Sequence, residues 1–335
     1  MPASNQPSTQ APIVTIFGGS GFVGRYIARR MAKDGWRVRV AVRRPNEAIF
    51  VRPYGNVGQV EPVQANIRDD ASTARAVEGA SVVINCVGIL YENSRQKFDN
   101  VQAEGAGRIA QAAAAAGVSK MIHISAIGAD VESDSAYART KGEGEAAVLA
   151  AFPNAVILRP SIIFGAEDQF FNRFAAMAKL SPVLPMVGAD TLFQPIYVDD
   201  VAKAATNAAT GDAAGIYELG GPQTYTFRAL MKIMLTEIRR RRLLIALPFF
   251  AARLMAWGLD LVGTLSLGIL ANRQITQDQV KLLANDNVVS DGAKGLGDLD
   301  VRPTTVESVI GEYLYAYRPA GQYEAITESA GNLKV

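Results

Sequence analysis

Cysteine and histidine are nearly absent from this chain of 335 residues, which contains one of each, Cys86 and His123. A disulfide framework needs paired cysteines, and the common zinc sites use several cysteines or histidines. The sequence therefore predicts no disulfide and no metal site, and it fits a reducing compartment. The single histidine also argues against a Ser–His–Asp hydrolase, and we expect His123 to be packed and hydrogen-bonded rather than catalytic.

A large excess of charge of one sign is missing as well. Lys and Arg total 34 and Asp and Glu total 32, which gives a formal net charge of +2. Proteins that bind nucleic acid through their overall charge are far more basic. We therefore expect no nucleic-acid partner, and any basic surface must be local.

Long apolar runs are the third feature that the chain lacks. A helix that crosses a bilayer needs about 20 nearly unbroken apolar residues, and the longest uncharged run in the apolar C-terminal region, Leu261 to Asn272, is shorter. We expect no transmembrane helix. Residues Met1 to Ala11 lack a basic start followed by an apolar stretch, so they predict a flexible tail rather than a signal peptide.

Short apolar runs that alternate with helical segments are abundant, and 49% of the residues are hydrophobic. This alternation predicts an α/β fold, a Rossmann doubly wound parallel sheet with right-handed crossovers and a smaller, mostly helical C-terminal lobe. The expected strands are Ile13 to Phe17, Arg37 to Val42, Ser81 to Val87, Met121 to Ser125 and Ala155 to Ile163. The expected helices include Phe22 to Lys33, Gln102 to Ala116 and Phe170 to Leu180.

The pattern of elements changes after residue 165. We expect residues 12–165 to form the dinucleotide-binding domain and residues 194–220 to return to it. Residues 166–193 and 221–335 then form the smaller lobe, which serves for docking of a substrate, a partner or a membrane surface. Pro182 and Pro185 are expected to break the chain within it.

A glycine-rich turn follows the first strand and opens the first helix. Gly18, Gly21 and Gly24 have the spacing G-x-x-G-x-x-G, which is informative in this strand–helix context. The turn is tight, and the backbone must come close to a pyrophosphate that the helix N-terminus attracts. The candidate cofactor-binding residues here are Gly18, Gly19, Ser20, Gly21, Phe22 and Val23.

The end of the second strand bears on the choice between NAD and NADP. NAD sites usually have a carboxylate there for the ribose 2′-hydroxyl, whereas this chain has Arg43 and Arg44. Guanidinium groups pair well with a 2′-phosphate, so the sequence predicts NADPH with Arg43 as the first candidate. The alternative is two solvated arginines on a loop.

Two further strand ends are candidates for the adenosine half of the site. Asn66 and Ile67 follow a further expected strand, between those of Arg37 to Val42 and Ser81 to Val87, and could line the adenine pocket. Cys86, Val87 and Gly88 lie at the end of the strand that begins at Ser81, where the backbone usually runs past the adenine ribose. We expect the Cys86 side chain itself to be a small buried apolar group.

Tyr137 and Lys141 form a Y-x-x-x-K pair and share a face if this segment is helical. A nearby ammonium lowers the pKa of a phenol, which is ordinarily about 10, so the pair suits acid–base chemistry. Lys141 could also hold the nicotinamide ribose. Ser125 ends the preceding strand and could bind a carbonyl or hydroxyl. The pair could equally bind cofactor without turnover.

These motifs, in this order, resemble the extended or atypical branch of the short-chain dehydrogenase/reductase superfamily. Its R-P-x-x-x-[YF]-G segment matches Arg159 to Gly165, which implies that Pro160 lies beside the nicotinamide. Its V-x-V-D-D-V-A segment is similar to Pro195 to Ala202. Within this branch, Lys120 to Ser125, Phe164 to Phe174 and Gln194 to Val198 resemble the nucleotide-binding accessory subunits of respiratory complex I, of the alpha-subcomplex subunit nine type, in a bacterial version.

This resemblance implies a tightly held NADPH with a structural or regulatory role and other complex I subunits as partners. The protein would lie on the peripheral arm near quinone entry, at the cytoplasmic face of the bacterial plasma membrane, without independent turnover. Two alternatives stay open. One is a free NADP(H)-dependent reductase, dehydrogenase or epimerase that uses Tyr137 and Lys141, and the other is a lipid- or quinone-linked enzyme at the membrane surface.

A basic segment next to an apolar one stands out near the C-terminus. Residues 228–242 contain six basic side chains and one acidic one, and Leu243 to Ala271 is strongly apolar. This combination suits an anionic membrane surface or a groove on a partner. The alternative is a buried helical lobe with a solvated basic face, and the resemblance to complex I subunits favours the interface. The four adjacent basic residues are Arg239, Arg240, Arg241 and Arg242.

Overall fold

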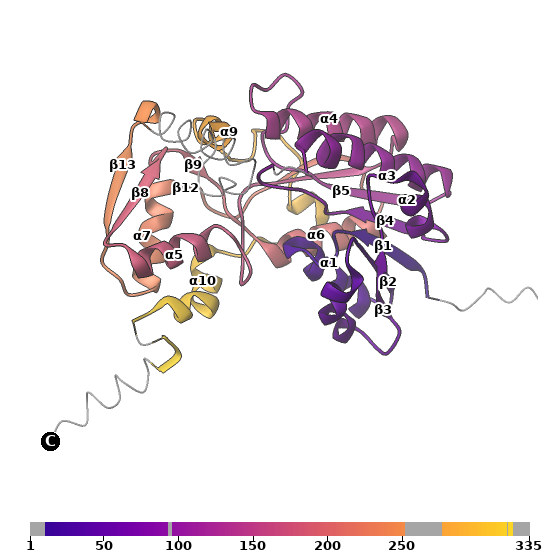
Figure 1. Ribbon diagram of the computed structural model, residues 1–335, viewed down its shortest axis with the longest axis horizontal. Helices are drawn as coiled ribbons and strands as arrows, with labels where there is room; N and C mark the ends of the chain where they lie inside the picture. The colour runs from indigo at the N-terminus through magenta and orange to yellow at the C-terminus, as the bar shows by residue number, and fades with distance from the viewer. Residues whose placement is uncertain (1–10, 93–95, 252–276, 320, 324–335) are drawn as a thin grey trace, which may run out of the picture.

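A seven-stranded parallel sheet forms the centre of the molecule (Figure 1), with the strand order β11-β6-β5-β4-β1-β2-β3. The computed structural model describes residues 11–92, 96–251, 277–319 and 321–323. The strands are β1 (Ile13–Phe17), β2 (Arg37–Val42), β3 (Val60–Gln64), β4 (Val82–Asn85), β5 (Lys120–Ile124), β6 (Val156–Pro160) and β11 (Gly215–Leu219). This is the predicted Rossmann sheet, and β11 forms one of its edges.

Helices cover both faces of this sheet. On one face α1 (Phe22–Lys33) packs beside α6 (Val198–Thr210), and Arg30 Nε donates to Asp199 Oδ1 at 2.7 Å between them. The other face carries α2 (Asp70–Val77), α3 (Glu104–Ala115) and α4 (Ala136–Ala151). Because both faces are covered, the central strands β1 and β4 consist mostly of apolar residues.

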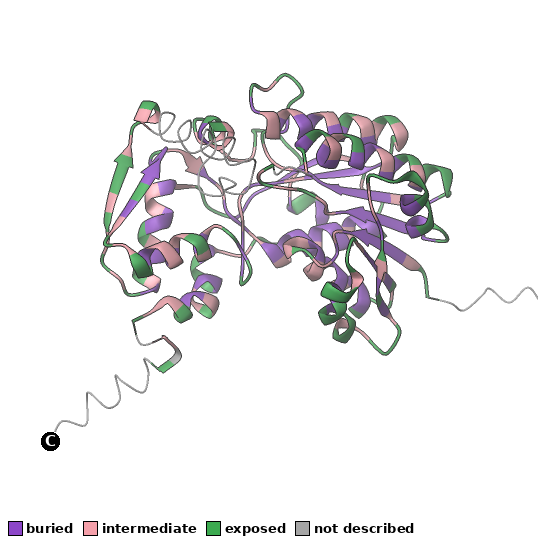
Figure 2. Cartoon of the chain, in the orientation of Figure 1, coloured by how far each residue is buried: buried purple, intermediate pink, exposed green. Residues whose placement is uncertain are grey.

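The alternation of side chains along β1 divides the core into two layers. Val14 and Ile16 pack in the cluster that contains α1 and α6, whereas Phe17 packs with Ile109 of α3 on the opposite face. All four are fully buried, as Figure 2 shows for the central strands. The parallel sheet therefore orients the carboxyl ends of β1, β4 and β5 toward one edge, where the site lies.

A second lobe packs around its own apolar cluster. Its helices are α5 (Phe171–Leu180), α7 (Phe227–Glu237) and α10 (Val306–Leu314), and α9 (Gln277–Leu282) lies between the lobe and α4. Three two-stranded sheets complete the structure. They pair β7 (Ile163–Phe164) with β10 (Ile196–Tyr197), β9 (Leu192–Phe193) with β12 (Tyr225–Thr226), and β8 (Val183–Val187) with β13 (Leu243–Leu247).

Short irregular helices connect these elements. They are η1 (Pro45–Tyr54), a π-type turn η2 (Asp99–Ala103), η3 (Gly297–Leu299), η4 (Tyr315–Tyr317) and η5 (Gly321–Tyr323). The π-type turn η2 runs directly into α3. The predicted helix from Gln102 therefore begins as a π turn and becomes α-helical at Glu104.

Two features differ from the sequence-based expectation of a helical lobe. Leu243–Leu247, the start of the apolar segment, is a strand because it pairs in parallel with β8, and this pairing accommodates Pro185 opposite Ile245. Figure 2 shows β13 mostly exposed and β8 largely buried. Leu296 and Leu299, which we assigned to the lobe, pack instead in the cluster beneath the main sheet. The division into domains at residue 165 stays a prediction.

Residues 1–10 of the predicted tail and residues 252–276 of the apolar segment lie outside the described residues. No helix in the described ranges is both long enough and apolar enough to cross a membrane.

Candidate functional site

The glycine turn after β1 is closed against the fourth strand. Gly18 has a φ of +72°, a conformation that favours glycine, and a Cβ there would lie 3.2 Å from the Cys86 carbonyl. A Cβ on Gly24 would overlap the Gly18 carbonyl oxygen. The turn therefore leaves no room for side chains at these positions, because it packs against the Cys86 backbone and against the start of α1.

The N-terminus of α1 is available for an anion. Its N-cap residue Gly21 makes no side-chain cap, and the first turn contains no acidic residue. The first amides of a helix have no partner within the helix, so those of Phe22 and Val23 can bind phosphate oxygens. The binding of a diphosphate by the predicted residues of this turn stays a prediction.

Arg25, which the motif analysis did not single out, supports the turn from outside. Its guanidinium donates to the carbonyls of Ser20 at 3.1 Å and Gly21 at 3.2 Å, and it pairs with Glu167 at 3.3 Å. It also lies 4.9 Å from the centre of the Phe50 ring. The signal for this role was a basic residue one helical turn after Gly21, which is too common to be diagnostic.

The two arginines after β2 are both exposed but differ in their partners. Arg44 pairs with Glu47 at 2.8 Å. With the Gln96 amide turned so that its oxygen faces the arginine, Arg43 donates to it at 2.6 and 3.0 Å. Arg43 therefore contacts a neutral group, and a 2′-phosphate would not have to displace a carboxylate there.

Residues predicted for the adenosine half take different roles. The Asn66 side chain accepts a hydrogen bond from the Arg68 amide at 3.2 Å and so closes its own turn. Ile67 is half-buried and packs with the apolar cluster of α2 and α3. Cys86 is also only half-buried, so the expectation of a buried side chain is met in part.

The Cys86–Gly88 segment lies directly beside the glycine turn. A Cβ on Gly18 would meet Cys86 and Val87, and one on Gly88 would lie 3.5 Å from Lys141 Nζ. This segment therefore connects the diphosphate turn with Lys141, as its predicted position beside the cofactor ribose requires.

Ser125 at the end of β5 and Tyr137 and Lys141 on α4 come together at the carboxyl edge of the sheet. Lys141 is 5% exposed, and its Nζ donates to the Ile124 carbonyl at 3.1 Å. Burial lowers the pKa of Lys141 to about 8, against the opposing effect of Glu145. Ser125 is also 5% exposed, and its Oγ has no hydrogen-bond partner among the described residues.

Tyr137 does not have the lowered pKa that the sequence predicted. Burial raises the pKa of its phenol to about 12, and its ring packs edge-on against Phe98 with 5.8 Å between centroids. The Lys141 ammonium is bound to a backbone carbonyl and does not offset the effect of burial on the pKa of Tyr137. Without a ligand, the Tyr137 hydroxyl therefore stays protonated at neutral pH.

His123 is packed and hydrogen-bonded, as expected. It is buried beneath the site, and its Nδ1 lies 3.0 Å from Asn85 Nδ2. Burial lowers the pKa of His123 to about 3, so the imidazole is neutral. Asn85 in turn accepts from the Val87 amide at 3.0 Å and so supports the segment beside the glycine turn.

A cleft of about 810 Å³ opens from these residues toward the second lobe. Phe22, Ser125, Tyr137 and Pro160 all line it, so the structure brings these four predicted residues together. Its far side is formed by α5 and by residues 281–287. The predicted residues at the adenosine end, from Arg43 to Gly88, lie outside this cleft.

The N-terminus of α4 is capped from a distant part of the chain. Asp278 of α9 accepts hydrogen bonds from Ser135 Oγ at 2.9 Å, the Ala136 amide at 2.8 Å and the Tyr137 amide at 3.1 Å. Lys281 Nζ donates to the Asp134 carbonyl at 3.0 Å. Ser135 is recognisable in the sequence as an N-cap, but nothing local in the sequence points to Asp278.

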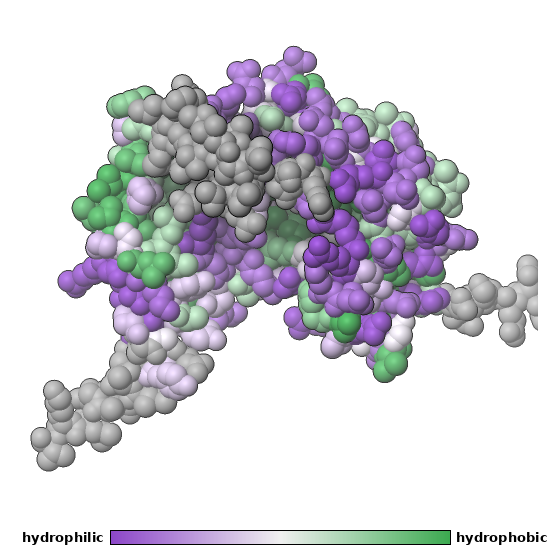
Figure 3. Space-filling view, in the orientation of Figure 1, coloured by the Kyte–Doolittle hydropathy of each residue, from purple (hydrophilic) through white to green (hydrophobic). Residues whose placement is uncertain are grey.

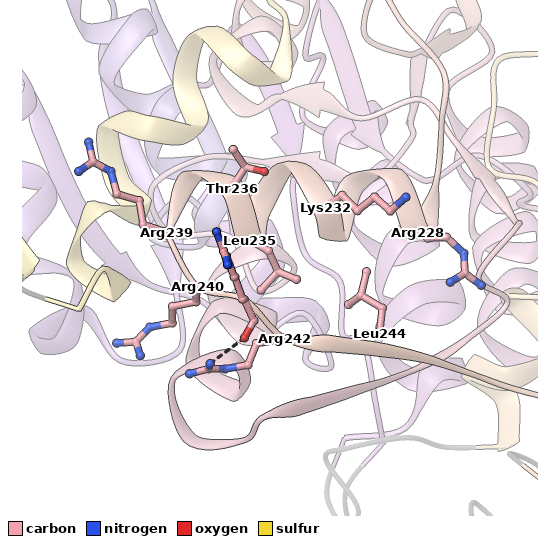
Figure 4. A pocket seen from close by; sticks show the side chains of 9 residues that line it. Arg228, Lys232, Leu235, Thr236, Arg239, Arg240, Arg242 and Leu244 are labelled. Atoms are coloured by element: carbon pink, nitrogen blue, oxygen red, sulfur yellow. Dashed lines mark hydrogen bonds between the residues drawn. The ribbon is translucent and has the colours of Figure 1, made fainter.

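A second pocket of about 790 Å³ lies on the other lobe (Figure 4). It is lined by Arg228, Lys232, Leu235, Thr236, Arg239, Arg240, Arg241, Arg242 and Leu244. Two of these arginines also have structural bonds. Arg240 Nε donates to the Tyr317 carbonyl at 2.8 Å, and Arg242 Nε donates to the Ala178 carbonyl at 2.7 Å. The basic cluster is therefore held together by the fold of the lobe.

The fold has counterparts among known proteins. Residues 14–220 match the NAD dependent epimerase/dehydratase family. The solved structure of dTDP-glucose 4,6-dehydratase from Streptomyces venezuelae, with NAD and TYD bound, superimposes with a TM-score of 0.68. It covers 94% of this chain and 99% of its own, at 18% identity.

Two curated relatives are closer in sequence. The mitochondrial NADH dehydrogenase [ubiquinone] 1 alpha subcomplex subunit 9 of Arabidopsis thaliana is 35% identical over 94% of this chain and 80% of its own. The ceramide reductase of Caulobacter vibrioides is 34% identical over 70% of this chain and 74% of its own. The chain thus belongs to the NAD dependent epimerase/dehydratase family, and within it to the group of the complex I alpha-subcomplex subunit 9 proteins.

Proposed function

We propose that this protein is an NADPH-binding accessory subunit of a respiratory NADH:quinone oxidoreductase, complex I, with a structural or regulatory role. The observation that carries the proposal is the 35% identity to an alpha-subcomplex subunit 9 across 94% of the chain. Sequence similarity over nearly the whole length includes the second lobe, where a subunit of an assembly would make its own contacts. The partners would be other complex I subunits.

The nucleotide part of the proposal rests on the site. The glycine turn and the α1 N-terminus would hold the diphosphate, Arg43 the 2′-phosphate, and Lys141 the nicotinamide ribose. Asn66, Ile67 and the Cys86–Gly88 segment would border the adenosine. Pro160 and Phe22 would face the nicotinamide end. A nicotinamide dinucleotide supplies a hydride when it takes part in chemistry, and a tightly held one can instead stabilise the fold by mass action.

The proposed location is peripheral, at the cytoplasmic face of a bacterial plasma membrane near quinone entry. The basic pocket of Figure 4 and the exposed apolar side chains beside it support this. Leu243 is 62% exposed and Ile245 is 39% exposed. Basic residues attract anionic lipid by about 1 kcal/mol each near the surface, and exposed apolar side chains add to it. Arg239 to Arg242 would make the contact.

The test is a pull-down of the full-length protein from detergent-solubilised membranes, with mass spectrometry of the bound proteins and of the bound nucleotide. We expect co-purification of quinone oxidoreductase subunits and of NADPH. A soluble protein that co-purifies with none of these subunits would overturn the accessory role. NADH in place of NADPH would overturn the 2′-phosphate assignment alone.

A second candidate is a free NADP(H)-dependent reductase, and one observation favours it. Ser125 and Tyr137 present polar groups to a cleft large enough for a substrate, and the relative from Caulobacter vibrioides bears the name ceramide reductase. In such an enzyme Ser125 would orient a carbonyl and the Tyr137 hydroxyl would supply its proton. Substrate-dependent oxidation of NADPH by the purified protein would support it.

A further inference from the structure

The polar groups around the cleft fall into two classes. Ser125 and Tyr137 both line the cleft. Ser125 Oγ is buried and has no hydrogen-bond partner among the described residues, which is unfavourable for a hydroxyl. Tyr137 is half-buried, and no hydrogen bond to its hydroxyl is seen within the described ranges. Both groups project from the sheet edge and the start of α4, so one atom of a ligand could meet them together.

Several other polar side chains that line the cleft are already paired, whereas Gln169 and Asn285 are exposed to solvent. Ser161 Oγ bonds Asn287 Oδ1 at 2.7 Å, Asp286 Oδ1 accepts from the Leu192 amide at 2.8 Å, and Ser135 bonds Asp278. Lys281 donates to the carbonyl of Asp134. These bonds leave Ser125 and Tyr137 as the groups that a ligand can satisfy at the inner end.

The charges that line the cleft balance. Arg173 and Lys281 are the basic residues, Asp134 and Asp286 are the acidic ones, and all four are exposed at its rim. A site for a nucleotide diphosphate would need an excess of cations around the two phosphates. The cleft has no such excess among its described lining residues.

The remaining walls are apolar. Ile127 and Ile162 come from the ends of β5 and β6, and Phe170, Phe174 and Phe193 form an aromatic wall on the second lobe. Phe170 lies 5.6 Å from Phe174 and 6.3 Å from Phe193, ring centre to ring centre. Figure 3 shows hydrophobic side chains in the hollow between the two parts of the molecule. Such walls bind apolar groups through burial.

We propose that this cleft binds an uncharged ligand with an apolar body and one carbonyl or hydroxyl head, which hydrogen-bonds to Ser125 and Tyr137. This inference deepens the proposed function. It rests on that function in one respect, namely that the nicotinamide of the proposed cofactor would lie at one end of the same cleft. The unpaired hydroxyls select the head, the aromatic wall selects the body, and the balanced charges disfavour a nucleotide-sugar.

The test uses the full-length protein loaded with NADPH and a series of linear methyl ketones, each one methylene longer than the last. The nicotinamide fluorescence reports binding. Each methylene buried is worth about 0.8 kcal/mol, so affinity should rise by about fourfold per methylene until the cleft is full. UDP-glucose should not displace the ketone. Affinity that is independent of chain length, or displacement by UDP-glucose, would overturn the proposal.

Two variants separate the contribution of the ligand's polar head to binding from that of its apolar body. Ser125→Ala should lower the affinity for every ketone by about two- to tenfold and leave the dependence of affinity on chain length intact. Ile127→Thr, which replaces an apolar side chain of the wall with a smaller polar one, should reduce that dependence and keep the effect of the head. If Ser125→Ala binds all the ketones as the parent does, the head is not held as proposed.

This experiment and the pull-down test different claims, so a negative result in one does not imply a negative result in the other. The fluorescence of bound NADPH before any ketone is added reports the nucleotide site, and co-purification reports membership of the complex. A protein that keeps both but binds ketones without dependence on chain length would contradict only the inference about the cleft.

Discussion

Lys141 is held by the backbone of the strand beside it. Its ammonium is buried and donates to the Ile124 carbonyl, and burial lowers its pKa to about 8. A buried ammonium keeps its charge only while it has such a partner. The same contact fixes Lys141 Nζ beside Gly88, where a ribose hydroxyl could bond it. The residue is thus oriented for a ligand before one arrives.

The proposed preference for NADPH over NADH rests on Arg43. Arg43→Asp replaces a guanidinium with a charge that repels a 2′-phosphate, so we expect NADPH to bind on the order of 100-fold more weakly. NADH should change by less than about threefold. The measurement is titration of both nucleotides by fluorescence.

Arg44→Asp is the matched control, because Arg44 is equally exposed but already pairs with Glu47. Its effect on NADPH should be clearly smaller than that of Arg43→Asp. Equal losses of affinity for NADPH and for NADH in the Arg43→Asp variant would refute the assignment of Arg43 to the 2′-phosphate.

His123 makes the stability of the protein depend on pH in a predictable direction. The pKa is about 3 in the folded protein and 6.5 ordinarily. Between these values the unfolded chain binds a proton that the folded chain does not, so stability falls as the pH drops below about 6.5. We expect urea denaturation to show this loss in the parent protein and not in His123→Gln.

NMR provides an independent check, since this is the single histidine of the chain. Its imidazole signals should stay at their neutral positions from about pH 8 to 5. A titration near the ordinary pKa, with the fold intact, would show that the imidazole is open to solvent.

At the scale of elements, α9 acts as the cap of α4. The carboxylate of Asp278 satisfies two backbone amides at the helix start and the hydroxyl of the N-cap Ser135. A negative charge at a helix N-terminus is also favourable for the helix dipole. The orientation of Tyr137 is therefore linked to the docking of a helix that follows it by about 140 positions in the chain.

Asp278→Ala removes this cap. We expect the free energy of unfolding to fall by about 1–2 kcal/mol, measured by urea denaturation. Hydrogen exchange at the Ala136 and Tyr137 amides should become faster, while exchange at α1 should not change. Asp291→Ala is the control, because Asp291 is exposed and the described residues show no bond to its side chain. Equal effects of the two variants would argue against the capping role.

The end of α7 shows how a local turn shapes the basic cluster. Arg239 has a φ of 52°, the Arg239 amide bonds the Thr236 carbonyl at 3.1 Å, and the Arg240 amide bonds the Leu235 carbonyl at 3.1 Å. This pair of bonds is a Schellman motif, which glycine usually closes. The reversal of direction spreads the four arginines along the surface next to β13.

At the scale of the whole molecule, the cleft lies where the sheet edge meets the second lobe. One wall carries the groups that could take part in chemistry, and the other is an aromatic surface. The basic pocket is on the lobe, so a surface contact there and a ligand in the cleft would involve different residues. An accessory role and ligand binding are therefore compatible in one protein.

Assembly into the complex should not need the Tyr137 hydroxyl. Tyr137→Phe keeps the ring contact with Phe98 and removes only the hydroxyl. We expect normal NADPH content and normal co-purification with complex I subunits, measured by native electrophoresis and mass spectrometry. Arg43→Asp is the comparison, because it tests whether assembly needs the nucleotide. Failed assembly of Tyr137→Phe with NADPH still bound would contradict a structural role.

The sequence by itself determined the features that depend on near neighbours in the chain. The glycine turn, the strand and helix alternation, and the positions of Ser125, Tyr137 and Lys141 follow from spacing, because strand ends in a parallel sheet share one edge. Helix α1 and strand β2 have the predicted bounds.

Only the tertiary structure decided which distant segments meet. Asp278 reaches α4, Leu243–Leu247 pairs with β8, and Leu296 packs beneath the main sheet. Burial also reversed the expected shift in the pKa of Tyr137. These outcomes depend on packing and solvent exclusion between residues far apart in sequence, which local patterns do not encode.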